Sequence, residues 1–309
     1  MVALLFPGQG SQFVGMGREL ADRFPAARDT FAEADAVLGF PLARLMWEGP
    51  EDELTATRNA QPAILTHSVA VLRCMGGRTG AVDYAAGHSL GEFSAYVAAG
   101  SLGFADALRT VRRRGELMFE SGQQRPGTMA ALLGLEDAEV ERICREASAE
   151  GEGEGEVVPA NYNAPSQVVI SGDVAAVERA MELAKAAGAK RVVALNVSGA
   201  FHSPLMAVAE QGLRAQLEGV TMRAPRFPVL SNVTAAPVTD AEEARRLLVR
   251  QLTSPVRWTA SMRALVDAGV DRFLELGPGG VLSGLLRRVT KELPARTIGT
   301  AEETEAFLA

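Results

Sequence analysis

The sequence has few cysteines, few histidines and no long apolar run in its 309 residues. Its only cysteines, Cys74 and Cys144, are too few for a disulfide framework and are wrongly spaced for a zinc site. The apolar start of the chain lacks a basic leader and stops at Pro7, so neither a signal peptide nor a membrane helix is expected. We therefore expect a cytoplasmic protein without a metal site.

An excess of positive charge is also absent, because the formal net charge at pH 7 is −7. A protein whose main partner is nucleic acid needs a basic surface, so the charge argues against that function class. With 47% hydrophobic and 22% charged residues the chain has an ordinary globular composition. Its length suits one large domain or a large domain with a smaller one inserted.

The first part of the chain shows a strand-turn-helix pattern twice. We expect strands at 3–6 and 84–86, and helices up to about residue 75, at 91–99 and at 104–120. Alternation of this kind predicts a parallel sheet covered by helices. The breaker-rich stretch 121–127 then predicts a hinge.

A different order of elements follows this hinge. The pattern predicts a strand, a helix, two strands, a helix and a strand at 129–133, 137–149, 157–161, 167–171, 174–187 and 191–195. This β-α-β-β-α-β order is typical of a ferredoxin-like unit. Residues 150–156 alternate Glu and Gly, which predicts a solvated loop without a ligand role. Strands near 229–231 and 272–276 then return to the first pattern.

Ser89 stands at the centre of the sequence Gly87-His88-Ser89-Leu90-Gly91, between a predicted strand and a predicted helix. This context is the one that a nucleophile elbow requires. The flanking glycines permit a strained turn that exposes the hydroxyl, and the helix amides point toward an oxyanion on a bound carbonyl. The plain structural alternative is a serine that caps the helix.

A serine nucleophile needs a base, and the sequence has only His67, His88 and His202. His67 falls inside a predicted helix, where a packed histidine is the simpler interpretation, and His88 belongs to the elbow itself. His202 lies in a loop after the strand that re-enters the large unit, where catalytic groups tend to lie in α/β folds. His202 is therefore the candidate base, although by itself it could be an ordinary loop histidine.

Helical phase separates the three consecutive arginines at 112–114. The apolar face of their helix is set by Phe104, Leu108, Val111, Gly115 and Met118. Arg114 lies about 60° from Val111, whereas Arg112 and Arg113 lie about 100° and 160° away, so Arg114 alone points inward. A buried arginine needs an anionic partner, and its planar fork suits a carboxylate. If no protein carboxylate pairs with it, an acyl group that ends in a carboxylate would.

These patterns together predict an α/β fold. We expect an α/β-hydrolase-like core with a parallel sheet and a nucleophile elbow, formed by residues 1–124 and 197–309. A small ferredoxin-like subdomain, residues 125–196, interrupts it.

In its motifs the chain resembles the malonyl-CoA:acyl carrier protein transacylases of bacterial fatty acid synthesis, and also the acyltransferase domains of polyketide synthases. The resemblance extends over almost the whole length. The matching stretches are residues 6–12, 61–63, 87–92, 114–115, 163–165, 167–172, 199–203 and 275–279.

The resemblance implies that Ser89 is acylated, that His202 is its base and that Arg114 holds the malonyl carboxylate, in agreement with the choices made from the residues. It further implies an oxyanion hole made by the backbone amides of Gln9 and Leu90. The backbone carbonyl of Gln251 is implied to orient the histidine, so no acidic residue need complete a triad.

Three further positions resemble pocket-lining positions of these families. Phe201 matches a phenylalanine that favours malonyl over methylmalonyl in polyketide acyltransferases, although it could be a simple core aromatic. Asn163 and His88 also match pocket positions, but packing or turn formation would explain them equally.

From the resemblance we expect transfer of a malonyl group from malonyl-CoA to the phosphopantetheine thiol of acyl carrier protein, through a malonyl-serine. We expect a monomer that uses no cofactor, with malonyl-CoA as a substrate. A stand-alone acyltransferase of a polyketide synthase shares every motif quoted. A serine hydrolase or thioesterase, or a non-catalytic carrier-docking module, are the more distant alternatives.

Overall fold

The larger of the two sheets in the described part of the chain carries the N-terminal strand at its centre. The structure is a computed structural model that describes residues 1–149 and 155–309. In spatial order the larger sheet contains β10 (Ala295–Ile298), β9 (Arg272–Leu276), β1 (Val2–Phe6), β2 (Tyr84–Gly87), β7 (Val229–Leu230) and β8 (Pro237–Val238). All neighbouring pairs are parallel except β7 and β8, which are antiparallel. The predicted parallel sheet is thus confirmed.

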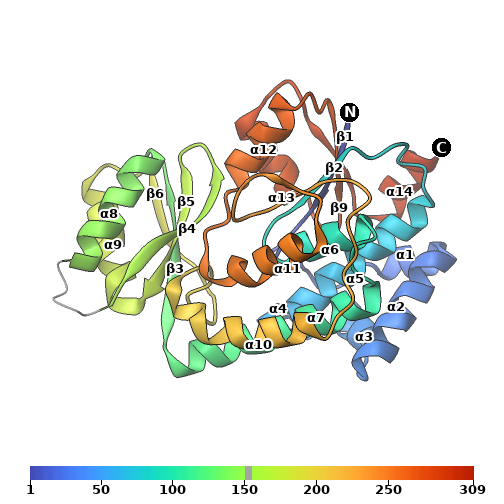
Figure 1. The fold of residues 1–309 in the computed structure, drawn as a ribbon, viewed down its shortest axis with the longest axis horizontal. Helices are drawn as coiled ribbons and strands as arrows, with labels where there is room; N and C mark the ends of the chain where they lie inside the picture. The colour runs from blue at the N-terminus through green and yellow to red at the C-terminus, as the bar shows by residue number, and fades with distance from the viewer. Residues whose placement is uncertain (150–154) are drawn as a thin grey trace.

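Helices cover both faces of this sheet, as Figure 1 shows. The helices outside the smaller sheet unit are α1 (Arg18–Arg23), α2 (Pro25–Leu38), α3 (Leu42–Glu48), α4 (Glu51–Thr55), α5 (Thr57–Met75), α6 (Gly91–Ala98), α7 (Phe104–Gln124), α10 (Ala207–Glu218), α11 (Ala241–Arg250), α12 (Trp258–Asp267), α13 (Val281–Val289) and α14 (Ala301–Leu308). Short 3-10 turns, η1 (Pro204–Met206) and η2 (Gln251–Thr253), precede α10 and follow α11. Among the described residues, no helix combines the length and apolarity needed to cross a membrane.

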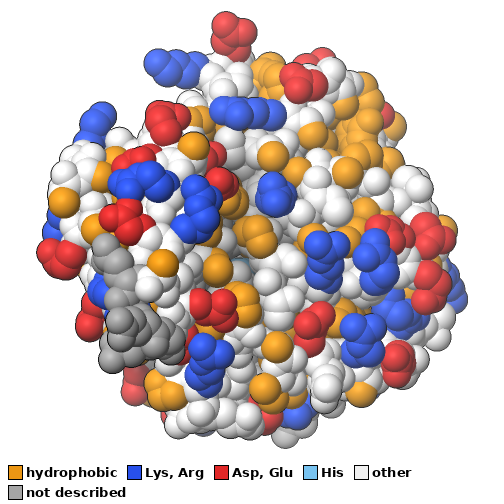
Figure 2. All heavy atoms as spheres, turned by 60° about the vertical axis from the view of Figure 1, so that its left-hand side comes forward, with side chains coloured by type: hydrophobic (Ala, Val, Ile, Leu, Met, Phe, Trp, Pro, Cys, Tyr) orange, Lys and Arg blue, Asp and Glu red, His pale blue; other side chains and the backbone are white. Residues whose placement is uncertain are grey.

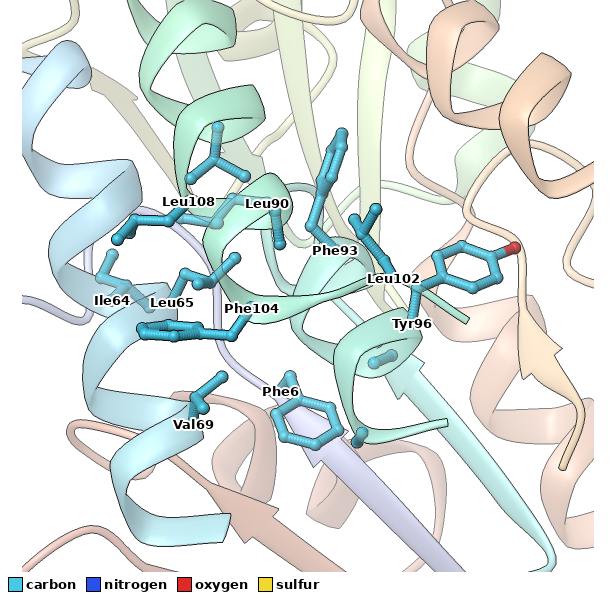
Figure 3. Packing of buried hydrophobic residues seen from close by; sticks show 14 of the residues in the cluster. Phe6, Ile64, Leu65, Val69, Leu90, Phe93, Tyr96, Leu102, Phe104 and Leu108 are labelled. Atoms are coloured by element: carbon cyan, nitrogen blue, oxygen red, sulfur yellow. The ribbon is translucent and has the colours of Figure 1, made fainter. Parts of the chain in front are cut away.

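Strand β1 is buried on both faces, and its side chains divide between two cores. Ala3 and Leu5 pack with residues of α12 and α13. Leu4 and Phe6 pack with α5, α6 and α7 on the opposite face, and Figure 3 shows Val69 of α5 near Phe6. Alternate residues of a strand point to opposite faces, so a strand covered on both sides is apolar throughout.

The smaller sheet lies at the left of Figure 1 with two helices on its outer face. Its order is β4 (Val157–Ala164), β5 (Gln167–Asp173), β3 (Gly127–Leu133) and β6 (Arg191–Ala194), with every neighbouring pair antiparallel. Helices α8 (Asp137–Ala149) and α9 (Val174–Ala186) pack on Ala130, Ile170 and other residues of one face. Met129 and Val169 directly precede Ala130 and Ile170, so their side chains point to the opposite face of the sheet. There they pack with the core that also contains residues of α5, α6 and α7.

The structure differs from the predicted hinge at 121–127, because α7 continues to Gln124 and β3 begins at Gly127. A Cβ at Gly122 would lie 2.1 Å from the carbonyl oxygen of Ser198, so this glycine lets the returning chain pass against the helix. Gly122 is therefore needed for the close contact between α7 and the chain at Ser198, and it does not end the helix. Of the predicted loop at 150–156, residues 150–154 lie outside the described residues.

Candidate active site

Ser89 lies in a tight turn between β2 and α6. Its φ of 51° is in the left-handed region, which is uncommon for a residue with a side chain. A Cβ at Gly87 would lie 1.9 Å from the carbonyl carbon of Gly91, and one at Gly91 would lie 2.1 Å from the carbonyl oxygen of Phe6. Both glycines are required because strand, turn and helix approach so closely.

Asn232 holds this turn from the neighbouring strand region, just after β7. Its Oδ1 accepts a hydrogen bond from the amide of Ser89 at 2.7 Å, and its Nδ2 donates to the carbonyl oxygen of Gly87 at 2.7 Å. The sequence analysis missed Asn232. Its position after a strand, at the edge where ligand sites gather in parallel sheets, is the signal that could have suggested it.

His202 reaches Ser89 from the loop that follows the smaller sheet. Its Nε2 lies 2.8 Å from Ser89 Oγ, and its Nδ1 donates to the carbonyl oxygen of Gln251 at 2.9 Å. That second bond assigns the proton to Nδ1 and leaves Nε2 to accept from the serine hydroxyl. Burial, followed by the positive charge of Arg114, lowers the pKa of His202 to about 3. The imidazole is therefore neutral at neutral pH.

Arg114 is buried, with 1% of its surface exposed, and it contacts the same serine. Its Nη2 donates to Ser89 Oγ at 3.1 Å and to Gln251 Oε1 at 2.9 Å, and its Nη1 donates to Gln61 Oε1 at 2.8 Å. Burial lowers the pKa of Arg114 to about 10, so the guanidinium remains charged at neutral pH. No carboxylate of the described residues forms an ion pair with it.

The neighbouring arginines point outward, as the helical phase predicted. Arg112 and Arg113 both form ion pairs with Glu116 on the accessible side of α7. Gly115 brings α7 against α5, since a Cβ there would lie 2.7 Å from the backbone of Arg58. This close contact places Arg114 within reach of Gln61, whose role the sequence analysis did not recognise.

Gln251 and Glu92 form a buried layer behind the serine, and the sequence analysis assigned no role to either side chain. Gln251 Nε2 donates to Glu92 Oε2 at 2.7 Å and to the carbonyl oxygen of Ser89 at 3.0 Å. Glu92 Oε2 also accepts from the amide of Asn232 at 3.1 Å. Burial raises the pKa of Glu92 to about 7. One carboxylate oxygen thus supports both the residue that orients His202 and the residue that holds the elbow.

Gln9 and Leu90 line the pocket, and their backbone amides have no hydrogen-bond partner among the described residues. Neither nitrogen donates to any backbone or side-chain acceptor among the described residues, and both residues line the same pocket as Ser89. The side chain of Gln9 donates to Thr57 Oγ1 at 3.1 Å, which fixes the first turn beside α5. Backbone amides that are free of other acceptors are available to a developing oxyanion.

The pocket in front of Ser89 has a volume of about 370 Å³. The larger unit contributes Met118 and Phe201, and the smaller sheet contributes Met129 and Val169. Further lining residues include Gln12, Thr55, Asn161, Leu195 and Val197.

His88 and Asn163 meet across the two units. His88 Nε2 lies 2.8 Å from Asn163 Oδ1 of β4, and both residues line the pocket. Burial lowers the pKa of His88, so it is neutral. The predicted site residues are therefore brought together, from six separate segments of the chain.

His67 is packed inside α5 away from the pocket, with 1% of its surface exposed, as the simpler interpretation predicted. Within residues 1–149 and 155–309, no group of three or more His, Cys, Asp or Glu residues is arranged to hold a metal ion.

The chain is similar to known proteins over nearly its full length. Residues 3–306 match the model of the acyl transferase domain family. A malonyl CoA-acyl carrier protein transacylase of Bacillus subtilis is 46% identical over 98% of this chain and 95% of its own length. The enzyme of the same name from Escherichia coli K12 is 46% identical over 99% of this chain and 98% of its own.

Among solved structures, one similar chain is a malonyl-transacylase in complex with its type II polyketide synthase acyl carrier protein in the holo form. The TM-score is 0.95 at 44% sequence identity, covering 99% of this chain and 98% of that chain.

Proposed function

The chain belongs to the acyl transferase family that includes the malonyl-CoA:acyl carrier protein transacylases, and we propose that it transfers malonyl groups through an ester on Ser89. Malonyl-CoA is the donor, and the phosphopantetheine thiol of an acyl carrier protein is the acceptor. The reaction belongs to fatty acid synthesis. It requires neither a metal nor a cofactor, because the serine, the histidine and the amides supply every step.

In the first half-reaction His202 Nε2 takes the proton of Ser89 as its Oγ attacks the thioester carbonyl of malonyl-CoA. The amides of Gln9 and Leu90 receive the oxyanion. Collapse of the tetrahedral intermediate breaks the carbon–sulfur bond, and His202 returns the proton to the coenzyme A thiolate. Malonyl-Ser89 remains in the pocket.

In the second half-reaction the carrier's thiol takes the place of coenzyme A. His202 accepts the thiol proton, and the sulfur attacks the malonyl ester. The oxyanion forms again between Gln9 and Leu90. When the ester bond breaks, His202 returns the proton to Ser89 Oγ, and malonyl carrier protein leaves.

The observation that carries this proposal is the position of Arg114. Its buried guanidinium lies 3.1 Å from Ser89 Oγ and is bonded to two neutral amide oxygens, without a carboxylate in direct contact among the described residues. A buried cation beside a nucleophile suits an acyl group that brings its own negative charge. A hydrolase of neutral esters has no use for this arrangement.

The test compares Arg114→Ala with Arg113→Ala, a matched change at an arginine on the accessible side of the same helix. Arg114→Ala should lose malonyl transfer and keep or gain acetyl transfer, whereas Arg113→Ala should resemble the parent enzyme. Mass spectrometry after mixing with malonyl-CoA should find the malonyl adduct on Ser89 of the parent. Unchanged malonyl transfer in Arg114→Ala would contradict the assignment.

The acyl pocket is proposed to select malonyl by shape as well as charge. Phe201 is buried and lines the pocket beside His202, where its ring leaves little room for an α-methyl group. Phe201→Ser should therefore raise transfer from methylmalonyl-CoA relative to malonyl-CoA. Asn163 and His88, joined by their hydrogen bond, form another part of the lining.

A polyketide carrier is a second candidate acceptor. The observation that favours it is the likeness to a malonyl-transacylase solved with a type II polyketide synthase carrier. Offering one malonylated preparation to a fatty-acid carrier and to a polyketide carrier, and comparing the two transfer rates, separates the candidates.

The docking face for either carrier is proposed to be locally basic, because carrier proteins of both pathways are acidic. Two pairs of exposed basic residues are candidates, Lys190 with Arg191 at the start of β6 and Arg287 with Arg288 in α13. Arg288 already donates to Gln167 Oε1 and to the carbonyl oxygen of Pro165. On the face seen in Figure 2, basic side chains are interspersed with acidic ones.

We also propose a division into residues 1–124 with 197–309, an α/β-hydrolase-like core, and residues 125–196, a ferredoxin-like subdomain, in a monomeric enzyme. The elbow at Ser89 supports the first description. The order β4-β5-β3-β6, with α8 and α9 on one face, supports the second.

A further inference from the structure

The two hydrogens of Arg114 Nη2 are both engaged in this structure. One is donated to Ser89 Oγ at 3.1 Å and the other to Gln251 Oε1 at 2.9 Å. Nη1 donates to Gln61 Oε1, while Nε is buried without a hydrogen-bond partner among the described residues. The free donors of this guanidinium are therefore Nε–H and one hydrogen of Nη1.

A bidentate contact with a carboxylate cannot use those free donors alone. A guanidinium offers two parallel forks, one formed by Nη1 with Nη2 and the other by Nε with Nη2. Both forks include Nη2. A carboxylate that binds Arg114 in the strong bidentate form must take a hydrogen that now serves either Ser89 or Gln251.

Gln251 is the contact that stays. Its Nε2 donates both hydrogens, one to Glu92 Oε2 and one to the carbonyl oxygen of Ser89, so its Oε1 is held toward Arg114. Gln251 is fully buried, and its backbone carbonyl also accepts from His202. Ser89 Oγ, in contrast, ends a side chain that rotates about a single bond.

We propose that the malonyl carboxylate displaces Ser89 Oγ from Arg114, so that the substrate itself releases the nucleophile. In the resting enzyme the guanidinium occupies a lone pair of the oxygen that must attack. This inference rests on the proposed function, and it assigns to Arg114 a restraint on Ser89 in addition to substrate binding. A neutral acyl group leaves the restraint in place.

The release also changes the base. The charge of Arg114 is the second cause, after burial, that lowers the pKa of His202. A carboxylate on Arg114 offsets that charge, so His202 becomes a stronger base when malonyl is bound. Selection for malonyl thus acts on the chemical step as well as on binding.

The experiment measures how fast a small neutral reagent modifies Ser89 with and without a separate carboxylate. Methanesulfonyl fluoride sulfonylates the serine, fluoride leaves and the hydroxyl proton goes to His202. Formate is small enough to occupy Arg114 beside the reagent. We expect formate to accelerate sulfonylation of the parent enzyme by about tenfold at saturation, the effect of removing one charge-assisted hydrogen bond. Equal ionic strength of chloride should not accelerate it.

Two variants locate the effect. Formate should have no effect on sulfonylation of Arg114→Ala, whereas Arg113→Ala should keep the acceleration. If formate leaves the parent rate unchanged or lowers it, or accelerates Arg114→Ala equally, the inference is overturned. The malonyl adduct on Ser89, measured in the same preparation, keeps the outcomes distinct: an adduct without formate acceleration refutes only the release, and no adduct refutes the transferase.

Discussion

Asn232 bridges the two sides of the turn that carries Ser89, with its Oδ1 2.7 Å from the Ser89 amide and its Nδ2 2.7 Å from the Gly87 carbonyl oxygen. The amide of Ser89 is therefore already bonded, whereas that of Leu90 has no acceptor among the described residues. The same bridge holds the left-handed φ of Ser89.

Asn232→Ala should lower both stability and rate. The change removes the partner of the half-buried Ser89 amide and of the buried Gly87 carbonyl. We expect a loss of about 1–3 kcal/mol of unfolding free energy for the buried carbonyl, and less for the amide. A turn that relaxes by an ångström would lower kcat by about 100-fold. Chemical unfolding and steady-state malonyl transfer measure the two effects. If Asn232→Ala folds correctly and keeps the kcat of the parent enzyme, Asn232 does not position Ser89 for catalysis.

Arg114→Lys should keep the positive charge but lose the paired N–H donors with which a guanidinium binds a carboxylate. An ammonium is a point charge that cannot hold a carboxylate by two parallel bonds. We expect the KM for malonyl-CoA to rise by about tenfold, the loss of one charge-assisted hydrogen bond. The KM for acetyl-CoA should not rise, and an equal increase for both donors would instead indicate general damage to the pocket.

Gly122→Ala should displace the loop that carries His202. The added methyl would lie 2.1 Å from the carbonyl oxygen of Ser198, so the chain must shift, at about 1–3 kcal/mol. Gly284→Ala is the matched control, because that glycine also lies in a helix but nothing lies within 4 Å of its Cβ. The control should be stabilised by up to about 1 kcal/mol. Thermal unfolding and kcat, measured for both, should separate them.

His67 should make the protein less stable in acid. Burial lowers its pKa from 6.5 to about 4 in the folded state, so the unfolded chain binds a proton that the folded chain refuses. Stability from this source is complete above pH 6.5 and is lost as the pH falls toward 4, on the order of 3 kcal/mol. Because His67→Gln does not titrate, its unfolding free energy should fall less over this range. Parallel pH profiles of parent and variant would contradict the prediction.

Much of the fold and part of the site could be predicted from local pattern. Glycines around a serine between strand and helix indicate the elbow, and the phase of one helix is enough to turn Arg114 inward. Period-two and period-3.6 signals likewise indicate the order of strands and helices. These features depend on residues that are close in the sequence.

The remaining features depend on residues that meet only after folding. Asn232 and Ser89 are 143 positions apart, and Gln251 and Glu92 are 159 apart, so no local pattern connects them. The continuation of α7 through Gly122 has the same origin, because the reason for that glycine lies at Ser198. The sequence likewise could not show that Arg114 rests on neutral amides.

The smaller sheet leaves and rejoins the rest of the chain at neighbouring points, since Gly122 lies against Ser198 and Gly199. The reacting groups at Ser89, His202 and Arg114 all lie outside it, whereas Met129 and Val169 of the smaller sheet form one wall of the pocket. A change within this sheet can alter the lining of the pocket without altering the reacting groups. Arg114 and Phe201, which we propose to select the malonyl group, lie outside this sheet. Such a change would therefore reshape the cavity around the acyl group while the charge that holds its carboxylate is kept.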